Sequence, residues 1–262
     1  MKKQLFVIKI SGNIIDDEEK LSFFLEELAS VEGRKILVHG GGRLATRMAE
    51  QMQVPQQMVE GRRVTDAETL KIVTMVYAGY INKNIVAQLQ SLGCNAAGIS
   101  GADGNAVQAH KRKKGDVDYG YAGDIDSVNT AFFESLLEQD ITVVAAPITH
   151  DKKGQLLNTN ADSMAQEIAT ALASAYAVSL VYSFEKSGVL LDAEDEGSVI
   201  ARLDRAYYAQ LKEEKKVFAG MIPKLDNAFT AVEKGVEKVI IGMAEQLRKL
   251  VQGKSGTTIV NE

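Results

Sequence analysis

Residues Lys35 to Gly42 read KILVHGGG, in which a short apolar run passes into a histidine and three consecutive glycines. The pattern predicts a strand over Lys35 to Val38 and a helix from about Leu44. Three glycines between a strand and a helix expose several backbone N–H groups, with the helix dipole behind them, and this arrangement favours phosphate or carboxylate. The stretch lacks the ending of a P-loop and the spacing of a dinucleotide-binding loop. We interpret His39 as structural rather than catalytic.

The same alternation of short β-branched runs and longer helical patterns continues along the chain. It predicts an α/β fold, a three-layer αβα sandwich around an open, mainly parallel sheet. Further strands are predicted at Leu5 to Ile10, Ala96 to Ile99, Ile141 to Ala146, Val178 to Ser183, Lys238 to Ile241 and Thr257 to Val260. Further helices are predicted at Asp16 to Ser30, from a capping box at Thr65 to Glu68 toward Leu92, and from Asp162 to about Tyr176.

Two lobes are expected to share the one sheet. The first covers residues 1–172 and the second residues 173–262. The segment 101–127, with a basic run and many glycines, is expected to form turns and short hairpin strands.

Bulk composition excludes several classes of protein. With 45% hydrophobic and 25% charged residues, the chain has the balance of a soluble globular protein. Its formal charge of −5 argues against nucleic acid or an anionic membrane as partner. The single cysteine, Cys94, rules out an internal disulfide and favours a reducing compartment. No apolar run is long enough to span a bilayer, so we expect a cytoplasmic protein.

Three more patterns lie where a strand ends and a loop or helix begins, which is where open α/β sheets bind ligands. They are KISGN at 9–13, NTNAD at 158–162 and GMIPK at 220–224. Each has a structural alternative: Lys9 could reach water from an edge strand, Asp162 could be an N-cap, and Lys224 could be a surface lysine. Together with the glycine loop, they predict a phosphoryl-transfer site, which needs positioning and charge neutralisation.

These motifs, in this order and spacing, resemble the amino acid kinase family over nearly the whole chain. GRRVT at 61–65 and GVL at 188–190 add to the resemblance. Within the family, the likeness is to the members that use MgATP to phosphorylate the γ-carboxylate of N-acetyl-L-glutamate, the second step of arginine biosynthesis. The resemblance implies that the first lobe binds the acylglutamate and makes a homodimer, and that the second lobe binds ATP.

The resemblance also implies roles for single residues. Lys9 and Lys224 would stabilise the transferring phosphoryl group, and Asp162 would orient both lysines. Substrate binding would fall to Gly41 and Gly42 through their amides, and to Arg63 and Asn158 through the α-carboxylate. Nucleotide binding would fall to Gly12, Glu185, Lys186, Ser187, Gly188, Val189, Leu190, Lys216, Val217 and Phe218. Mg²⁺ would be carried by ATP rather than held by a protein metal site.

The chain departs from the family pattern at a few positions. Glu185 and Lys186 stand where the family often has Asp and Val, which leaves the nucleotide contacts open. Arg43 replaces proline or a small residue. Surface charge is its structural alternative, and we hypothesise that Arg43 pairs with an acyl group that ends in a carboxylate, such as N-succinyl. Arg62 replaces an apolar residue and is interpreted as surface charge.

Several alternatives remain open at this point. The chain could phosphorylate N-succinyl-L-glutamate instead. With the same fold, it could also be a carbamate, aspartate or uridylate kinase. A non-catalytic amino-acid or nucleotide sensor is the alternative from another class, although a sensor has no need of transition-state contacts. Because Lys9 lies so near the start of the chain, we expect a homodimer without arginine feedback.

Overall fold

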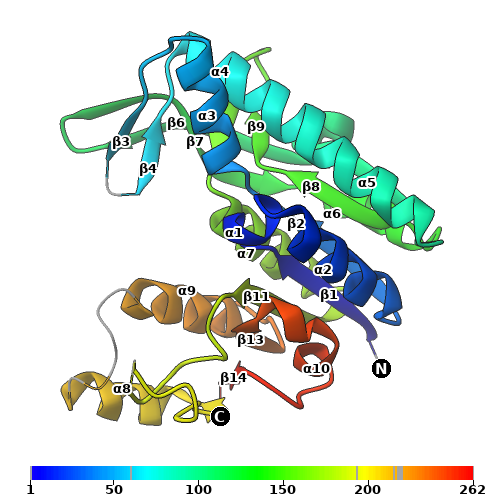
Figure 1. The fold of residues 1–262 in the computed structure, drawn as a ribbon, viewed down its shortest axis with the longest axis vertical. Helices are drawn as coiled ribbons and strands as arrows, with labels where there is room; N and C mark the ends of the chain where they lie inside the picture. Colours follow the sequence, from blue (N-terminus) through cyan, green and yellow to red (C-terminus); the bar gives the residue numbers. More distant parts are fainter. Residues whose placement is uncertain (1, 60, 193, 215, 217–220, 262) are drawn as a thin grey trace.

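The structure is a computed structural model that describes residues 2–59, 61–192, 194–214, 216 and 221–261 (Figure 1). Its centre is an eight-stranded sheet in which every neighbouring pair is parallel except β13 and β14. The strand order is β12 (Arg202–Leu203), β14 (Thr257–Ile259), β13 (Lys238–Met243), β11 (Tyr176–Phe184), β1 (Lys3–Lys9), β2 (Arg34–Val38), β8 (Thr142–Ala146) and β5 (Ala96–Ser100). The predicted open, mainly parallel sheet is confirmed.

Helices cover both faces of this sheet, as the three-layer prediction requires. One face carries α6 (Thr130–Leu137), α7 (Ala161–Leu172), α8 (Arg205–Glu213) and α9 (Ile222–Glu233). The other carries α1 (Gly12–Ile15), α2 (Glu18–Ser30), α3 (Gly42–Gln51), α4 (Ala67–Thr74), the π-helix η1 (Met75–Ile81), α5 (Asn82–Ser91) and α10 (Leu247–Val251). Two short 3₁₀ helices are η2 (Asp103–Asn105) and η4 (Ala244–Gln246).

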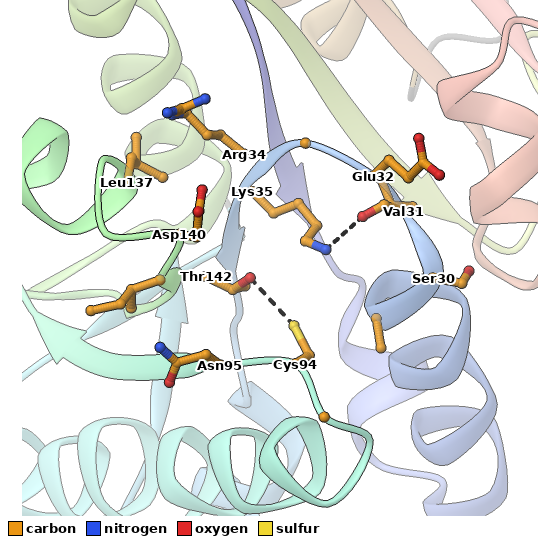
Figure 2. Close-up of a pocket in the computed structure, with 14 residues that line it drawn as sticks. Ser30, Val31, Glu32, Arg34, Lys35, Cys94, Asn95, Leu137, Asp140 and Thr142 are labelled. Carbon is orange, nitrogen blue, oxygen red and sulfur yellow. Dashed lines mark hydrogen bonds between the residues drawn. The ribbon is translucent and has the colours of Figure 1, made fainter.

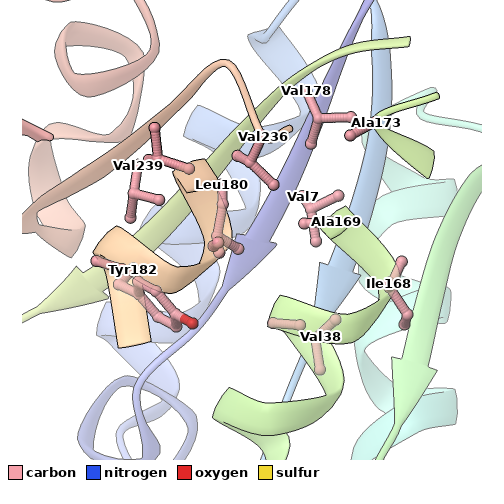
Figure 3. Close-up of a cluster of buried hydrophobic side chains, with 14 of the residues drawn as sticks. Val7, Val38, Ile168, Ala169, Ala173, Val178, Leu180, Tyr182, Val236 and Val239 are labelled. Atoms are coloured by element: carbon pink, nitrogen blue, oxygen red, sulfur yellow. The ribbon is translucent and has the colours of Figure 1, made fainter. Parts of the chain in front are cut away.

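The core follows from the alternation of side chains along each strand. On β1, Leu5 and Val7 join the cluster under α7 and α9, whereas Phe6 and Ile8 join the cluster under α2. Figure 3 shows the first cluster, where side chains of the strands meet Ile168 and Ala169 of α7. Because the strands are buried on both sides, they read as continuous apolar runs.

A smaller β-structure lies beside the carboxyl end of the main sheet. The strands β6 (Val107–Lys114), β7 (Val117–Val128), β9 (Ile148–His150) and β10 (Leu156–Thr159) close on one another. Next to them is the hairpin of β3 (Gln57–Val59) and β4 (Arg62–Val64). Figure 1 shows both hairpins at the end of the molecule away from the yellow-to-red C-terminal elements. Segment 101–127 therefore holds one long, bulged hairpin.

Predicted helix bounds differ from the structure by one to four residues. The helix predicted from about Leu44 begins at Gly42, and the helix predicted from Asp162 to about Tyr176 spans Ala161–Leu172, since Tyr176 begins β11. The second helix begins at Glu18, with Asp17 as its N-cap, because the Asp17 carboxylate accepts the N–H of Lys20. The helix after GRRVT is capped by Asp66, whose carboxylate accepts the N–H of Thr69. Thr65 does not cap this helix, and its hydroxyl instead bonds to Arg63 and Asn158. None of the helices among the described residues has the length and apolarity to cross a membrane.

Candidate active site

The glycine loop lies between β2 and α3, as the sequence predicts, and its shape depends on Gly41. Gly41 caps α3 with a φ of +146°, in the region that disfavours residues with a side chain. A Cβ built at Gly41 would lie 2.2 Å from Cδ1 of Ile81 and 3.1 Å from the ring of Tyr77, both in the π-helix η1. The loop is therefore pressed against η1, and only glycine fits there. π-helical turns such as those of η1 are frequent at functional sites.

Arg63 holds the glycine loop in place through hydrogen bonds. It is buried on β4, and its Nη2 donates to the carbonyl of Gly42 and to the hydroxyl of Thr46, both at 2.9 Å. Its Nη1 donates to Gln56 Oε1. Most donors of this guanidinium are thus engaged within the protein, which leaves few for a ligand.

Asn158 comes to the same place from β10. Its Nδ2 donates to the buried hydroxyl of Thr65 at 3.0 Å, and that hydroxyl donates to the carbonyl of Arg63 at 3.0 Å. A cavity of about 190 Å³ opens here. It is lined by Gly40, Gly41, Gly42, Met58, Gly61, Arg62, Arg63, Tyr77, Ala122, Pro147, Asn158, Thr159, Asn160 and Ala161. The structure therefore gathers all four predicted substrate-binding residues in one cavity.

The predicted charge cluster forms beside this cavity. The ammonium of Lys9, at the end of β1, lies 2.8 Å from a carboxylate oxygen of Asp162 in the first turn of α7. Lys224, on α9, places its ammonium 4.0 Å from the centre of the Phe184 ring. Desolvation lowers the pKa of Lys224, against the attraction of Asp162, and Lys9 adds to the lowering. The three predicted catalytic residues are thus within electrostatic reach of one another.

Arg43 and Arg62 have different surroundings. Arg43 extends from α3 into solvent with its Nε 3.9 Å from Asp16, and it is not among the residues that line the cavity. Arg62 lines the cavity, and burial lowers its pKa. The interpretation of Arg62 as surface charge is therefore wrong. Sequence reasoning also missed Tyr77, and no local signal marks it.

The predicted nucleotide-binding segment lies beyond β11. Two of its residues contact Glu196: the Lys186 ammonium lies 2.5 Å from this carboxylate, which also accepts the hydroxyl of Ser187 at 2.9 Å. This pairing raises the pKa of Lys186. Glu185 is exposed, and Gly12 opens α1 with room around it.

The remaining residues predicted to bind the nucleotide make contacts within the protein or lie outside the described residues. The buried Gly188 packs against Thr257, whose hydroxyl accepts the N–H of Val189 at 2.8 Å. Leu190 bridges to Val199, and Lys216 pairs with Glu214 at 2.7 Å. The predictions for Val217 and Phe218 lie outside the described residues. The structure brings none of these residues, among those described, into the cavity of the glycine loop.

His39 is fully buried and its hydrogen bonds fix its tautomer. Its Nδ1–H donates to the carbonyl of Gly40 at 2.9 Å, and its Nε2 accepts from the side-chain amide of Asn82 at 3.1 Å. The orientation of that amide follows from its other bonds, to the carbonyl of Val144 and from Lys83. Burial lowers the pKa of His39 to about 4, so the ring is neutral and structural, as interpreted.

This buried ring predicts a loss of stability in acid. As the pH falls below about 6.5, the unfolded chain protonates its histidine while folded His39 stays neutral down to about 4. The free energy of unfolding should therefore fall through this window, by roughly 3 kcal/mol from His39 alone. Urea unfolding at pH 7, 5.5 and 4.5 would measure it. His39→Gln should flatten the dependence, and equal slopes for the two proteins would contradict this origin.

A larger cavity lies at the opposite edge of the sheet, by the amino ends of β2 and β8 (Figure 2). Its volume is about 470 Å³. The buried Lys35 ammonium there donates to the carbonyl of Val31, the residue that ends α2, at 2.6 Å. A cation on the last carbonyls of a helix is a structural arrangement. The thiol of Cys94 lies 3.4 Å from the hydroxyl of Thr142. We assign this cavity no catalytic role.

Comparisons with known proteins agree with this geometry. The model of the amino acid kinase family matches residues 4–242. The chain is 52% identical to an acetylglutamate kinase of Parabacteroides distasonis over 221 residues, covering 84% of this chain and 87% of that one. It is 40% identical to an acetylglutamate kinase of Methanopyrus kandleri, covering 83% and 86%.

Solved structures share the fold. A carbamate kinase from Giardia lamblia bound to AMP-PNP superposes with a TM-score of 0.71 at 13% identity, covering all of this chain and 99% of that one. An N-acetylglutamate synthase from Neisseria gonorrhoeae, complexed with coenzyme A and N-acetyl-glutamate, has a TM-score of 0.82 at 22% identity, covering 99% of this chain and 60% of that one. From its sequence match over nearly its whole length, the chain belongs to the amino acid kinase family.

Proposed function

We propose that the chain transfers the γ-phosphoryl group of ATP to the γ-carboxylate of N-acetyl-L-glutamate, the second step of arginine biosynthesis. The observation that carries the chemistry is the pairing of Lys9 with Asp162, close to Lys224 and beside the glycine-loop cavity. The identity of about half of the aligned residues with curated acetylglutamate kinases supports the acceptor.

The reaction needs no general base. The γ-carboxylate has an ordinary pKa of about 4.3 and is already an anionic nucleophile at neutral pH. One of its oxygens forms a bond to the γ-phosphorus while the bond from that phosphorus to the β,γ-bridging oxygen breaks, and ADP leaves with the electron pair. The obstacle is the approach of two anions. Lys9, Lys224 and the amides at Gly41 and Gly42 would offset their repulsion.

Mg²⁺ would arrive on the phosphates of ATP and neutralise part of their charge. The described residues include no group of three or more His, Cys, Asp or Glu side chains that could hold a metal ion. Asp162 would act on the lysines rather than on the ion, because its carboxylate is already paired with Lys9. Arg63 and Asn158 would face the α-carboxylate of the substrate. The proposed location of the enzyme is the cytoplasm, where it would have access to ATP and N-acetyl-L-glutamate.

An ADP-release assay with a panel of acceptors tests the substrate. N-acetyl-L-glutamate should support turnover, while aspartate, carbamate and UMP should give only the rate without acceptor. Turnover with any of those three would show that the chain has the activity of another member of the amino acid kinase family. No stimulation by any of these acceptors, nor by N-succinyl-L-glutamate, would favour the non-catalytic sensor.

We also propose that the chain forms a homodimer through an apolar face of the first lobe. The face is a hollow of about 420 Å³ lined by Leu44, Met48, Met52, Ile72, Met75, Val76 and Tyr80. It joins one side of α3 to one side of α4 and η1, and Met75 and Tyr80 are more than half exposed. Contiguous exposed apolar surface of this kind marks an association site. Two helices side by side can pack on a second copy about a two-fold axis.

A charge placed in this face should prevent association. Sedimentation velocity is expected to show a dimer for the wild type and a monomer for Met75→Glu, because an unpaired carboxylate would be buried at the contact. Phe23→Glu, which changes an exposed phenylalanine of α2 outside the face, should remain dimeric. A monomeric wild type, or a dimeric Met75→Glu protein, would contradict the assignment.

A further inference from the structure

We propose that Arg62 binds a carboxylate of the substrate in the glycine-loop cavity, an inference that rests on the proposed kinase function. Arg62 and Arg63 are neighbours on β4, and both line that cavity. Their cross-strand partners on β3 are Val59 and Met58, respectively. The two guanidinium groups nevertheless have different surroundings, and this difference carries the proposal.

The donors of Arg63 are largely committed to the protein. They reach the carbonyl of Gly42, the hydroxyl of Thr46 and the side chain of Gln56. Arg62 has no hydrogen bond or ion pair with any described residue. A half-buried guanidinium has lost part of its hydration, and a ligand carboxylate would replace that hydration with two parallel hydrogen bonds.

The carboxylates whose charges reach Arg62 are already engaged by other cations. Asp124 lies 2.6 Å from Nη1 of Arg112. Asp162 lies 2.8 Å from the ammonium of Lys9. Both attract Arg62 electrostatically, while Arg112 repels it and burial lowers its pKa. The described residues that line the cavity include two arginines and no Asp or Glu, beside the loop that would receive the acceptor.

The ligand chemistry is a carboxylate from one of two places on the substrate. One source is the α-carboxylate of the glutamate moiety. The other is a carboxylate at the end of the acyl group, as in N-succinyl-L-glutamate. Arg43, which we first considered for that second role, instead lies near Asp16 and outside the cavity-lining residues. Arg62 is thus a specificity residue rather than a catalytic one.

The test compares Arg62→Gln with the wild type on three compounds: N-acetyl-L-glutamate, N-succinyl-L-glutamate and 4-acetamidobutyrate, which lacks the α-carboxylate. If Arg62 binds the α-carboxylate, KM should rise at least about tenfold for both glutamates and stay unchanged for 4-acetamidobutyrate. If it binds the acyl carboxylate, only the KM for N-succinyl-L-glutamate should rise. In either case kcat should stay within about threefold, because the lost contact binds the ground state and the transition state of the substrate equally.

Controls separate binding from structure. Arg62→Lys should restore part of the affinity, since it keeps the charge without the bidentate geometry. Arg43→Gln, a matched change outside the cavity, should leave every KM unchanged. The proposal is overturned if KM for all three compounds stays within twofold in Arg62→Gln. It is also overturned if kcat and the melting temperature fall while KM does not rise.

Failure of the kinase function would be seen separately. Calorimetric titration of wild type and Arg62→Gln with the same compounds measures binding without turnover. Binding that weakens tenfold in Arg62→Gln, with no ADP formed by the wild type, would support the role of Arg62 and contradict the kinase. Absence of binding to the wild type would overturn both.

Discussion

Lys9→Ala is expected to lower kcat by about 10²- to 10³-fold, the usual cost of removing one preorganised contact to developing charge. The ammonium of Lys9 lies 2.8 Å from Asp162 at the end of a central strand, so its position is fixed before substrate binds. The KM for ATP should change much less than kcat. Initial rates at varied ATP and N-acetyl-L-glutamate would measure both constants.

The fold should survive the change, because the Asp162 side chain is 39% exposed and water can reach its carboxylate once the lysine side chain is removed. Lys3→Ala is the matched control: Lys3 begins the same strand, is exposed, and lies at the end away from Asp162. It should keep full activity. A Lys9→Ala enzyme with wild-type kcat would remove Lys9 from the site.

Gly41→Ala should disrupt both stability and activity. The new methyl group would lie 2.2 Å from Ile81 Cδ1, and the backbone there has a positive φ. Overpacking and left-handed strain each cost roughly 1 to 3 kcal/mol. Displacement of the loop by even a fraction of an ångström misplaces the amides, so kcat/KM should fall about 10²-fold or more. Chemical denaturation and steady-state kinetics would measure the two effects.

Gly42→Ala is a close control, because its added Cβ would meet only Arg63 Nη2, at 3.8 Å. It should keep wild-type stability. Adding Ile81→Val to Gly41→Ala removes the clashing Cδ1 and should recover the packing part of the loss. If Gly41→Ala is as stable and active as Gly42→Ala, the loop is not held against η1 as described.

The sequence predicted the features that depend on neighbouring residues. The strand, the three glycines and the following helix form one local unit, and the continuous apolar run of β1 signals a strand buried on both faces. The proximity of Lys9 to Asp162 was implied by the family resemblance and not by the strand pattern, because Asp162 follows β10 of the smaller β-structure and not a strand of the main sheet. The N-cap of α4 was predicted at Thr65 and is Asp66, one residue later, because Thr and Asp are both good caps.

The sequence could not predict features that depend on distant partners. The use of Arg63 as a brace for Gly42 joins residues 21 positions apart through a hairpin that carries no strong local signal. The π-helix that presents Tyr77 and Ile81 to Gly41 is visible only in the folded chain. Arg62 could not be told from a solvated arginine, because the charged groups around it come from β6, β7 and α7.

Trapping of the product with hydroxylamine tests the central claim most directly. With ATP, Mg²⁺ and N-acetyl-L-glutamate, the wild-type chain should form one hydroxamate for each ADP released, since an acyl phosphate reacts with hydroxylamine. Lys224→Ala should form far less of both, because Lys224 would neutralise the transferring group. Release of ADP without hydroxamate, or no release of either product by the wild type, would contradict transfer to the γ-carboxylate.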